Sequence, residues 1–199
     1  TIDGKQLAVP RHFTILDAAK QAGIEIPSLC AHPELKPIGA CRICLVEVEK
    51  QRVLQPACTF PVSEGMVVHT QSPAVREARR FVLDLLLSDH PLDCMTCEKA
   101  GNCTLQDLAY DYGLKETSYH GEMHNWRLQD DNPFYVRDYN KCILCRRCIR
   151  ACDEINGVEA IGLINRGFET KVGAAYDGPM TDSPCEFCGM FVELCPVGA

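Results

Sequence analysis

Apolar and polar residues alternate between turn signals over the first seventy residues, which predicts a small β-rich unit with one helix. The stretch TIDGKQLAV predicts two short strands around an Asp3-Gly4 turn. The stretch TILDAAKQAGI predicts a helix that starts after Thr14 and stops at Gly23. The stretch CLVEVEKQRVLQPAC alternates and predicts a second hairpin. The order hairpin, helix, loop, hairpin is typical of a β-grasp fold.

The middle of the chain has the periodicity of helices. Ser72-Pro73 marks the cap and first turn of a helix that should end near Ser88-Asp89, because His90 precedes Pro91. Its expected apolar stripe consists of Val75, Ala78, Val82, Leu85 and Leu86. A shorter helix is expected around residues 104–110. The polar stretch 119–133 lacks periodicity and predicts a surface connection.

Composition narrows the class of protein. Fourteen cysteines in 199 residues approach the level of disulfide scaffolds, but the repeated C-x2-C spacing favours metal binding in a reducing cytoplasm. The net charge of -7 argues against nucleic acid as the main partner. The longest apolar run, Phe81–Leu87, is short and carries Asp84, so no membrane span is expected. The chain is expected to be a piece of a longer polypeptide that starts upstream of Thr1 and continues past Ala199.

The first cysteine constellation lies in the loops of the β-rich unit. It consists of Cys30, Cys41, Cys44 and Cys58, at the spacing C-x10-C-x2-C-x13-C. The close pair matches the plant-type run of [2Fe–2S] centres, although the first gap is longer. The small residues Gly39 and Ala40 let backbone amides approach cluster sulfide. A [2Fe–2S] cluster is therefore predicted, and a structural zinc site with four thiolates is the alternative.

Two cysteine runs about forty residues apart form an internal repeat near the C-terminal end. Bacterial two-cluster ferredoxins carry C-x2-C-x2-C-x3-C-P, and the fourth cysteine of each run ligates the other cluster. By this rule one [4Fe–4S] cluster is held by Cys142, Cys145, Cys148 and Cys195. A cluster of basic residues surrounds the first run, either to offset cluster charge, to dock an acidic partner or as a solvated face: Lys141, Arg146, Arg147 and Arg150.

The second cluster of this repeat lacks one ligand. Cys152, Cys185 and Cys188 remain, but Phe191 stands where the fourth cysteine belongs. The site has degenerated, or it holds a [3Fe–4S] cluster, or it holds a [4Fe–4S] cluster with a non-cysteine ligand. Three closely placed thiols without metal would be reactive, which favours a bound cluster.

Three cysteines in the stretch HPLDCMTCEKAGNC need a fourth partner. Cys94, Cys97 and Cys103 are spaced C-x2-C-x5-C, and the other eleven cysteines already belong to the three sites above. His90 is the nearest remaining ligand, although a lone histidine at this position also reads as a helix-end residue. A neutral imidazole in place of thiolate would raise the potential of the cluster.

The order of these motifs resembles one electron-transfer module. A four-cysteine β-grasp unit, His90-x3-Cys94-x2-Cys97-x5-Cys103 and a two-cluster ferredoxin segment occur together in the N-terminal part of [FeFe]-hydrogenases and of NAD(P)-linked formate dehydrogenase catalytic subunits. Diaphorase small subunits and the large peripheral-arm subunit of NADH:quinone oxidoreductase (complex I) are similar. The resemblance covers nearly all 199 residues. It implies that the His90 site is a [4Fe–4S] cluster.

The resemblance implies an α+β fold in three domains. Residues 1–70 would form the plant-type [2Fe–2S] β-grasp domain, residues 71–131 a helical domain with the one-histidine, three-cysteine [4Fe–4S] site, and residues 132–199 a bacterial-type two-cluster ferredoxin-like domain. The expected cofactors are one [2Fe–2S], two [4Fe–4S] and a third [4Fe–4S] or a [3Fe–4S] cluster. Complex I relatives have lost this last cluster, whereas hydrogenase and formate dehydrogenase relatives keep it. The chain, with Phe191, falls between them.

The function implied by the resemblance is electron relay within an NAD(P)-linked oxidoreductase. One partner would be a diaphorase-type subunit that binds flavin and NAD(P), and the other a catalytic subunit or domain for formate or hydrogen. The chain has no G-x-G-x-x-G or G-x-x-x-x-G-K-[ST] motif and no cysteine left for a catalytic centre. A complex I subunit fragment is the alternative, and a zinc-stabilised structural protein is the remote one.

Overall fold

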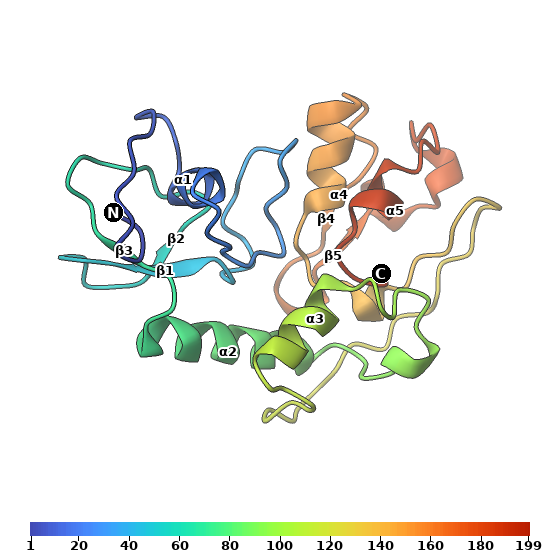
Figure 1. Ribbon diagram of the computed structural model, residues 1–199. Helices are drawn as coiled ribbons and strands as arrows, with labels where there is room; N and C mark the ends of the chain where they lie inside the picture. The colour runs from blue at the N-terminus through green and yellow to red at the C-terminus, as the bar shows by residue number, and fades with distance from the viewer.

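The computed structural model describes all residues, 1–199. Its N-terminal part is a three-stranded antiparallel sheet in the order β2-β1-β3, built from Gln55–Pro56, Leu45–Val48 and Val68–His69. Helix α1 (Ile15–Gln21) covers one face of this sheet, and helix α2 (Pro73–Leu87) runs beneath the other (Figure 1). A buried core of α1 and strand residues lies under α1.

The first predicted hairpin is wrong except for its turn. Asp3 and Gly4 both adopt positive φ, 46° and 78°, as a tight turn of this kind requires. Only an isolated bridge between Ile2 and Lys5 follows, and no strand forms there. Ile2 also bridges Val68 in parallel, so the short strand β3 provides the pairing that the sequence assigned to the first hairpin.

The two longest predicted helices are confirmed at both ends. Thr14 caps α1 through a reciprocal pair of bonds with Asp17, a capping box that the dipole of the first turn reinforces. Helix α2 spans Pro73–Leu87, with Ser72 as its N-cap and Ser88 as its C-cap. The predicted end near Ser88 is therefore confirmed.

The buried face of α2 differs from the predicted stripe by about one position. Its fully buried row is Val75, Arg79, Leu83 and Leu87. Leu85 is 44% exposed, which contradicts the prediction. The difference arises because Arg79 is completely buried: it donates to the Leu45 carbonyl from Nε at 3.1 Å and from Nη2 at 2.7 Å. It also donates to the Tyr112 hydroxyl at 3.3 Å, and so joins α2 to the sheet and to the segment after α3.

The C-terminal half consists of short elements around long loops. Helix α3 (Thr104–Asp111) follows α2, and the predicted surface connection 119–133 contains no helix or strand. Helix α4 (Arg147–Arg150) continues into the π-helical turn η3 (Ala151–Ile155), β4 (Gly162–Ile164) pairs with β5 (Lys171–Gly173), and α5 (Met190–Leu194) ends the set. The 3-10 turns are Cys94–Thr96, Tyr139–Lys141, Gly167–Glu169, Ala175–Asp177 and Met180–Asp182.

One hydrophobic core joins all parts of the chain. It combines residues of the N-terminal loops, α2, α3 and the C-terminal segment: Leu29, Ile43, Leu83, Leu87, Leu105, Leu108, Ala109, Leu114 and Val197, together with four cysteines. Figure 1 shows α2 passing from under the sheet toward α3, with α4 and α5 above it. No helix of the structure has the length and apolar character needed to cross a membrane.

Candidate metal centres

The structure brings the four cysteines of the first predicted site into contact. Cys30 follows the loop after α1, Cys44 precedes β1, and Cys58 follows β2. The thiol of Cys30 contacts those of Cys41 and Cys58, and the thiol of Cys44 contacts that of Cys58. All four are buried. Backbone amides also point at sulfur, because the Cys41 N–H lies 3.5 Å from Cys30 Sγ and the Leu29 N–H lies 3.4 Å from Cys41 Sγ.

These thiols cannot titrate independently. Contacts with Cys41 and Cys58 lower the pKa of Cys30 far below its usual value, and the matching contacts together with burial raise the pKa of Cys41 and of Cys58. Metal ions bind cysteine as thiolate, so a metal would take up the charge that protons now neutralise. Gly39 has φ +64°, and a Cβ there would lie 3.4 Å from Thr59 Oγ1, which explains the glycine in this loop.

The cysteines of the second predicted site lie between the end of α2 and the start of α3, and His90 lies on the same connection. His90 follows the C-cap of α2, Cys94 opens a 3-10 turn, and Cys103 is the N-cap of α3. Burial raises the pKa of Cys103, and the neighbouring thiols of Cys97 and Cys94 add to the rise. Burial lowers the pKa of His90, which favours the neutral imidazole that binds metals. Ser88 caps the helix, so the ring of His90 does not serve that purpose.

The C-terminal segment lies against this second site. A Cβ on Gly198 would lie 2.6 Å from Cys97 Sγ, a distance that real Cβ atoms do not reach. The Thr104 N–H donates to the Pro196 carbonyl at 3.0 Å, and the Asp138 N–H donates to the Ala199 carbonyl at 2.7 Å. The residues after Cys195 thus connect the third site to the second, and sequence reasoning missed Gly198.

The third predicted site is an open cavity. Cys142, Cys145, Cys148 and Cys195 line a space of about 470 Å³ together with Arg146 and Arg147. Burial raises the pKa of Cys142 to about 11, and the charges of Cys145 and Cys195 contribute. Burial also raises the pKa of Cys145 and Cys148. Metal ions bind cysteine as thiolate, so a centre bound here would deprotonate these thiols against the effect of burial.

The three cysteines of the fourth site line one smaller cavity, of about 20 Å³, with Phe191 on its wall. Donors point at each sulfur: Asn156 Nδ2 lies 2.8 Å from Cys188, Ala160 N lies 3.2 Å from Cys152, and Phe187 N lies 3.4 Å from Cys185. Cys148 of the third site lines this cavity too. Asn156 had no signal in the sequence, because its role depends on the π-helical turn that carries the chain past Cys152.

The side chain of Phe191 packs against an aromatic ring and offers no ligand atom. Its ring meets that of Tyr135 edge-on, with the centroids 4.7 Å apart and the planes at 87°. The Tyr135 hydroxyl lies beside Cys185, and burial followed by the charge of this thiol raises the pKa of Tyr135. The side chain at position 191 therefore fills the corner of the fourth site with carbon atoms only.

Buried polar atoms without partners provide a test of whether clusters fit these places. Four such atoms exist in the structure: His90 Nδ1, Tyr135 Oη, Arg137 Nε and Arg147 Nε. His90 belongs to the second site, and the other three residues line the cavity of the third. An unpartnered buried donor costs free energy, and native structures contain few of them. Thiolate and sulfide acceptors at these sites would satisfy the donors, so the residues present fit iron–sulfur clusters.

The spacing of the ligand groups differs from that of a site for one ion. No group of three or more His, Cys, Asp or Glu side chains is close enough to hold a single metal ion. In a [4Fe–4S] cluster each ligand binds a different iron, and in a [2Fe–2S] cluster each iron takes two, so the ligands of a cluster do not converge on one ion. All fourteen cysteines are free thiols.

Family comparisons cover almost the whole chain in three pieces. Residues 1–73 match the 2Fe-2S iron-sulfur cluster binding domain, and residues 79–118 match the NADH-ubiquinone oxidoreductase-G iron-sulfur binding region. Residues 132–199 match the ferredoxin-like domain of NADH-quinone oxidoreductase subunit 3. A [2Fe–2S] domain followed by [4Fe–4S] ferredoxin-like regions is therefore present, and the predicted α+β fold is confirmed.

Individual relatives agree with these families. The NADP-reducing hydrogenase subunit HndD of Solidesulfovibrio fructosivorans is 46% identical over all of this chain and 35% of its own length. A G-type subunit of the NADH-quinone oxidoreductase of Rhizobium meliloti is 42% identical over all of this chain and 23% of its own length. The chain thus spans about a third or less of these curated relatives.

A solved structure extends the likeness to three dimensions. A chain from an NAD+-reducing [NiFe]-hydrogenase in the H2-reduced state superposes with a TM-score of 0.92 at 34% identity. The match covers all of this chain and 84% of that one.

Proposed function

Because this chain belongs to the iron–sulfur family that NAD(P)-linked hydrogenases share with NADH-quinone oxidoreductase, we propose that it relays electrons between two partners. One partner is a flavin- and NAD(P)-binding subunit of diaphorase type, and the other is a separate catalytic centre. Bound clusters supply one-electron redox chemistry, while the chain sets their spacing, burial and hydrogen bonding. The cysteine usage favours a reducing cytoplasm.

The continuity of the buried core carries this proposal. Cys30 and Cys41 of the first site, Cys103 of the second and Cys145 of the third belong to one cluster of 13 buried residues. Cys148 lines the cavities of both the third and the fourth sites. Members of the first three ligand sets therefore share one buried core, and the third and fourth sets share a cavity wall. Such an arrangement serves electron transfer from cluster to cluster.

We propose four clusters. Cys30, Cys41, Cys44 and Cys58 hold a [2Fe–2S] cluster; His90, Cys94, Cys97 and Cys103 hold a [4Fe–4S] cluster; Cys142, Cys145, Cys148 and Cys195 hold another. Cys152, Cys185 and Cys188 hold a [3Fe–4S] cluster, because Phe191 offers no ligand atom at the remaining corner.

We propose hydrogen as the substrate of the catalytic partner, because two of the similar proteins are named as hydrogenases. Formate stays an expectation from the sequence resemblance. A component of the NADH-quinone oxidoreductase type is the second candidate. Phe191 favours this candidate, since the complex I relatives have lost the cluster at that site. The two family matches of the NADH-quinone oxidoreductase type favour it as well.

Iron analysis of the anaerobically purified protein tests the cluster set. Wild type should contain about 13 iron atoms per chain, and Phe191→Cys about 14, because the new thiolate completes the fourth site. Phe134→Cys is the matched control: Phe134 is 69% exposed, so its replacement adds a thiol without adding iron. About 10 iron atoms in wild type, with no gain in Phe191→Cys, would show that the fourth site is empty. Zinc in place of iron would overturn the whole proposal.

Reduction by candidate donors tests the partners. In the full-length protein with its associated subunits, NADH or NADPH and hydrogen should each bleach the cluster absorption, while formate should not. Bleaching by formate and not by hydrogen would identify the catalytic partner as a formate dehydrogenase. Bleaching by NADH alone, with electrons passing on to quinone, would support the second candidate.

A further inference from the structure

We propose that Arg147 sets the reduction potentials of two clusters at once, the [2Fe–2S] cluster of the first site and the [4Fe–4S] cluster of the third. This inference rests on the cluster assignment of the proposed function. Arg147 opens helix α4 between Cys145 and Cys148, so the chain places it directly at the third site.

The guanidinium of Arg147 reaches from one site to the other. Its Nη2 donates to the Ala31 carbonyl at 2.7 Å, one residue beyond Cys30. Its Nη1 lies 3.5 Å from the Leu194 carbonyl, one residue before Cys195. The cation is thereby fixed between backbone that immediately adjoins a ligand of the first site and backbone that immediately adjoins a ligand of the third.

The third nitrogen of this guanidinium, Nε, has no partner within the protein. Arg147 Nε is buried and makes no hydrogen bond. Arg147 also forms no salt bridge with a carboxylate. Groups that become thiolates on metal binding lie on both sides of it: Cys145 stands two residues earlier in the chain, and Cys30 adjoins the Ala31 carbonyl that Arg147 bonds. Since an arginine keeps its charge in proteins, the two cluster sites are its counter-charge.

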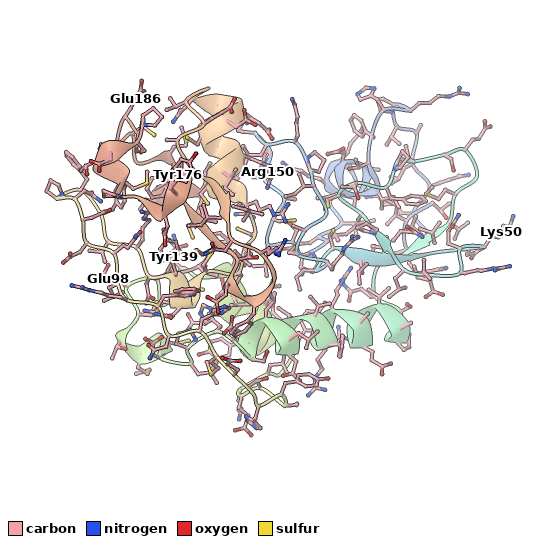
Figure 2. All side chains as sticks on the ribbon, turned by 180° about the vertical axis from the view of Figure 1, so that it is seen from behind. Lys50, Glu98, Tyr139, Arg150, Tyr176 and Glu186 are labelled. Carbon is pink, nitrogen blue, oxygen red and sulfur yellow. The ribbon has the colours of Figure 1, made fainter.

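Its neighbour Arg150 serves a different purpose. Arg150 donates to the carbonyls of Cys30, Lys36 and Arg146, so its Nε, Nη1 and Nη2 all have backbone partners. Figure 2 shows Arg150 on the side of α4 that faces the N-terminal part of the chain. Arg150 therefore holds the loop of the first site against α4, while Arg147 keeps a free N–H for an anionic acceptor.

A cation in this position affects the reduction potential of a cluster more than it affects the binding of that cluster. Each reduction adds one negative charge to a cluster, and a nearby buried cation stabilises the reduced form more than the oxidised form. The effect persists in salt because the charge is partly removed from solvent. One side chain thus raises two potentials together, which keeps the step between the two clusters nearly level.

The test is an EPR-monitored redox titration of the cluster-loaded full-length protein. In Arg147→Gln, the ratio of reduced to oxidised cluster at the wild-type midpoint should fall about tenfold for both clusters, or about 59 mV for a one-electron couple. Arg166→Gln is the matched control, because it removes the same charge at an exposed arginine that lines neither cluster site. In this control the ratio of reduced to oxidised cluster should change by less than about twofold, since solvent screens the charge.

The outcomes separate this inference from the proposed function. A shift in only one cluster, or in neither, would overturn the shared role of Arg147 while leaving the cluster assignment intact. Wild-type protein without the two EPR signals would overturn the assignment itself. If Arg147→Gln does not retain both clusters, Arg147→Lys decides, because it keeps a charge but loses the Nε donor. Both potentials should then fall by a smaller amount, and unchanged potentials would contradict the inference.

Discussion

In the proposed ligand set of the second site, His90 is the one neutral donor beside three thiols. Burial lowers the pKa of His90, and its Nδ1 is one of only four buried polar side-chain atoms without a partner. Both observations describe a ring that is held ready for an electrophile rather than for solvent. In the proposed assignment, the charge of the second cluster would therefore depend on this single side chain.

Replacing His90 by cysteine should lower the potential of the second cluster. A thiolate adds a negative charge where the imidazole is neutral, so the reduced state becomes less stable. Redox titration followed by EPR measures the change, and His90→Ala should lose about four iron atoms per chain. His120→Ala, at an exposed histidine, serves as the control and should keep both values. Full iron content in His90→Ala would remove His90 from the ligand set.

Gly198→Ala should disrupt the second site without touching its ligands. The added Cβ would lie 2.6 Å from Cys97 Sγ and 3.3 Å from Lys99 Cβ, so the C-terminal segment must move. We expect partial loss of the histidine-ligated cluster in the iron count and in its EPR signal. Gly121→Ala is the matched control, since no atom lies within 4 Å of the position of an added Cβ and the φ of Gly121 lies outside the left-handed region. An unchanged second cluster in Gly198→Ala would contradict this close approach.

Ligand spacing could be predicted from the sequence, but the groups around the ligands could not. Cysteines at C-x2-C spacing must turn toward one point, so the structure groups the thiols as their spacing indicated. Gly198 and Asn156 carry no local pattern, because their roles depend on segments far away in the chain. For Arg147 the sequence left burial and a solvated face equally open, and only the packing of α4 against the first site distinguishes them.

Helix α2 shows how an element can be placed correctly and rotated wrongly. Its capping residues predict both ends of the helix. Its buried face differs from the predicted apolar stripe because that stripe does not include Arg79. Burial of a guanidinium is rare unless its donors are satisfied, and here the Leu45 carbonyl and the Tyr112 hydroxyl satisfy them. Strand β3 escaped prediction for a different reason, since two residues are too few for any periodicity.

The irregular connection 119–133 is pinned to the end of α2 by His124. Its Nδ1 bonds the Asp89 carboxylate, its Nε2 bonds the Phe168 carbonyl, and its ring stacks on Phe168 with the centroids 3.9 Å apart. The Trp126 ring also stacks with that of His124, with the centroids 5.4 Å apart. A segment without helix or strand thus gains a fixed position from one aromatic side chain.

This clamp should make stability depend on pH. Burial opposes protonation of His124, but the bonds to Asp89 and Phe168 outweigh it and raise the pKa. A raised pKa contributes stability that is full below the unfolded value, about 6.5, and is lost as pH rises through the folded value. The melting temperature of wild type should therefore exceed that of His124→Gln most at low pH, and the gap should narrow as pH rises past neutral. A gap that stays constant with pH would contradict the clamp.

The molecule as a whole is organised around its cofactor sites rather than beside them. Cys30, Cys41, Cys103 and Cys145 form part of the core that joins the N-terminal loops, α2, α3 and the C-terminal segment. The loop of the first site is also tied to α4 and η3, through the bonds of Arg147 and Arg150 and through Glu154, which accepts the Lys36 N–H at 2.7 Å. The parts of the chain therefore share both their packing and their ligands.

Removal of the clusters should destabilise all parts together. Metal binding contributes directly to folding free energy, and here the ligands lie inside a shared core. Anaerobic treatment with a chelator should lower the melting temperature by on the order of 10 °C and leave one transition by circular dichroism. Reconstitution with iron and sulfide should restore the original value. Two separate transitions, or an unchanged melting temperature, would show that the parts fold independently of the clusters.

The C-terminal segment that rests on Cys97 has a consequence for biosynthesis. A ribosome delivers the chain from its N-terminal end, so the ligands of the first site are all present once Cys58 has emerged, and those of the second once Cys103 has emerged. The third site must wait for Cys195, and the second receives its cover only when Gly198 follows. The ligand sets are therefore completed in the order of translation, and the third set, whose Cys145 shares a core with Cys30 and Cys103, is completed last.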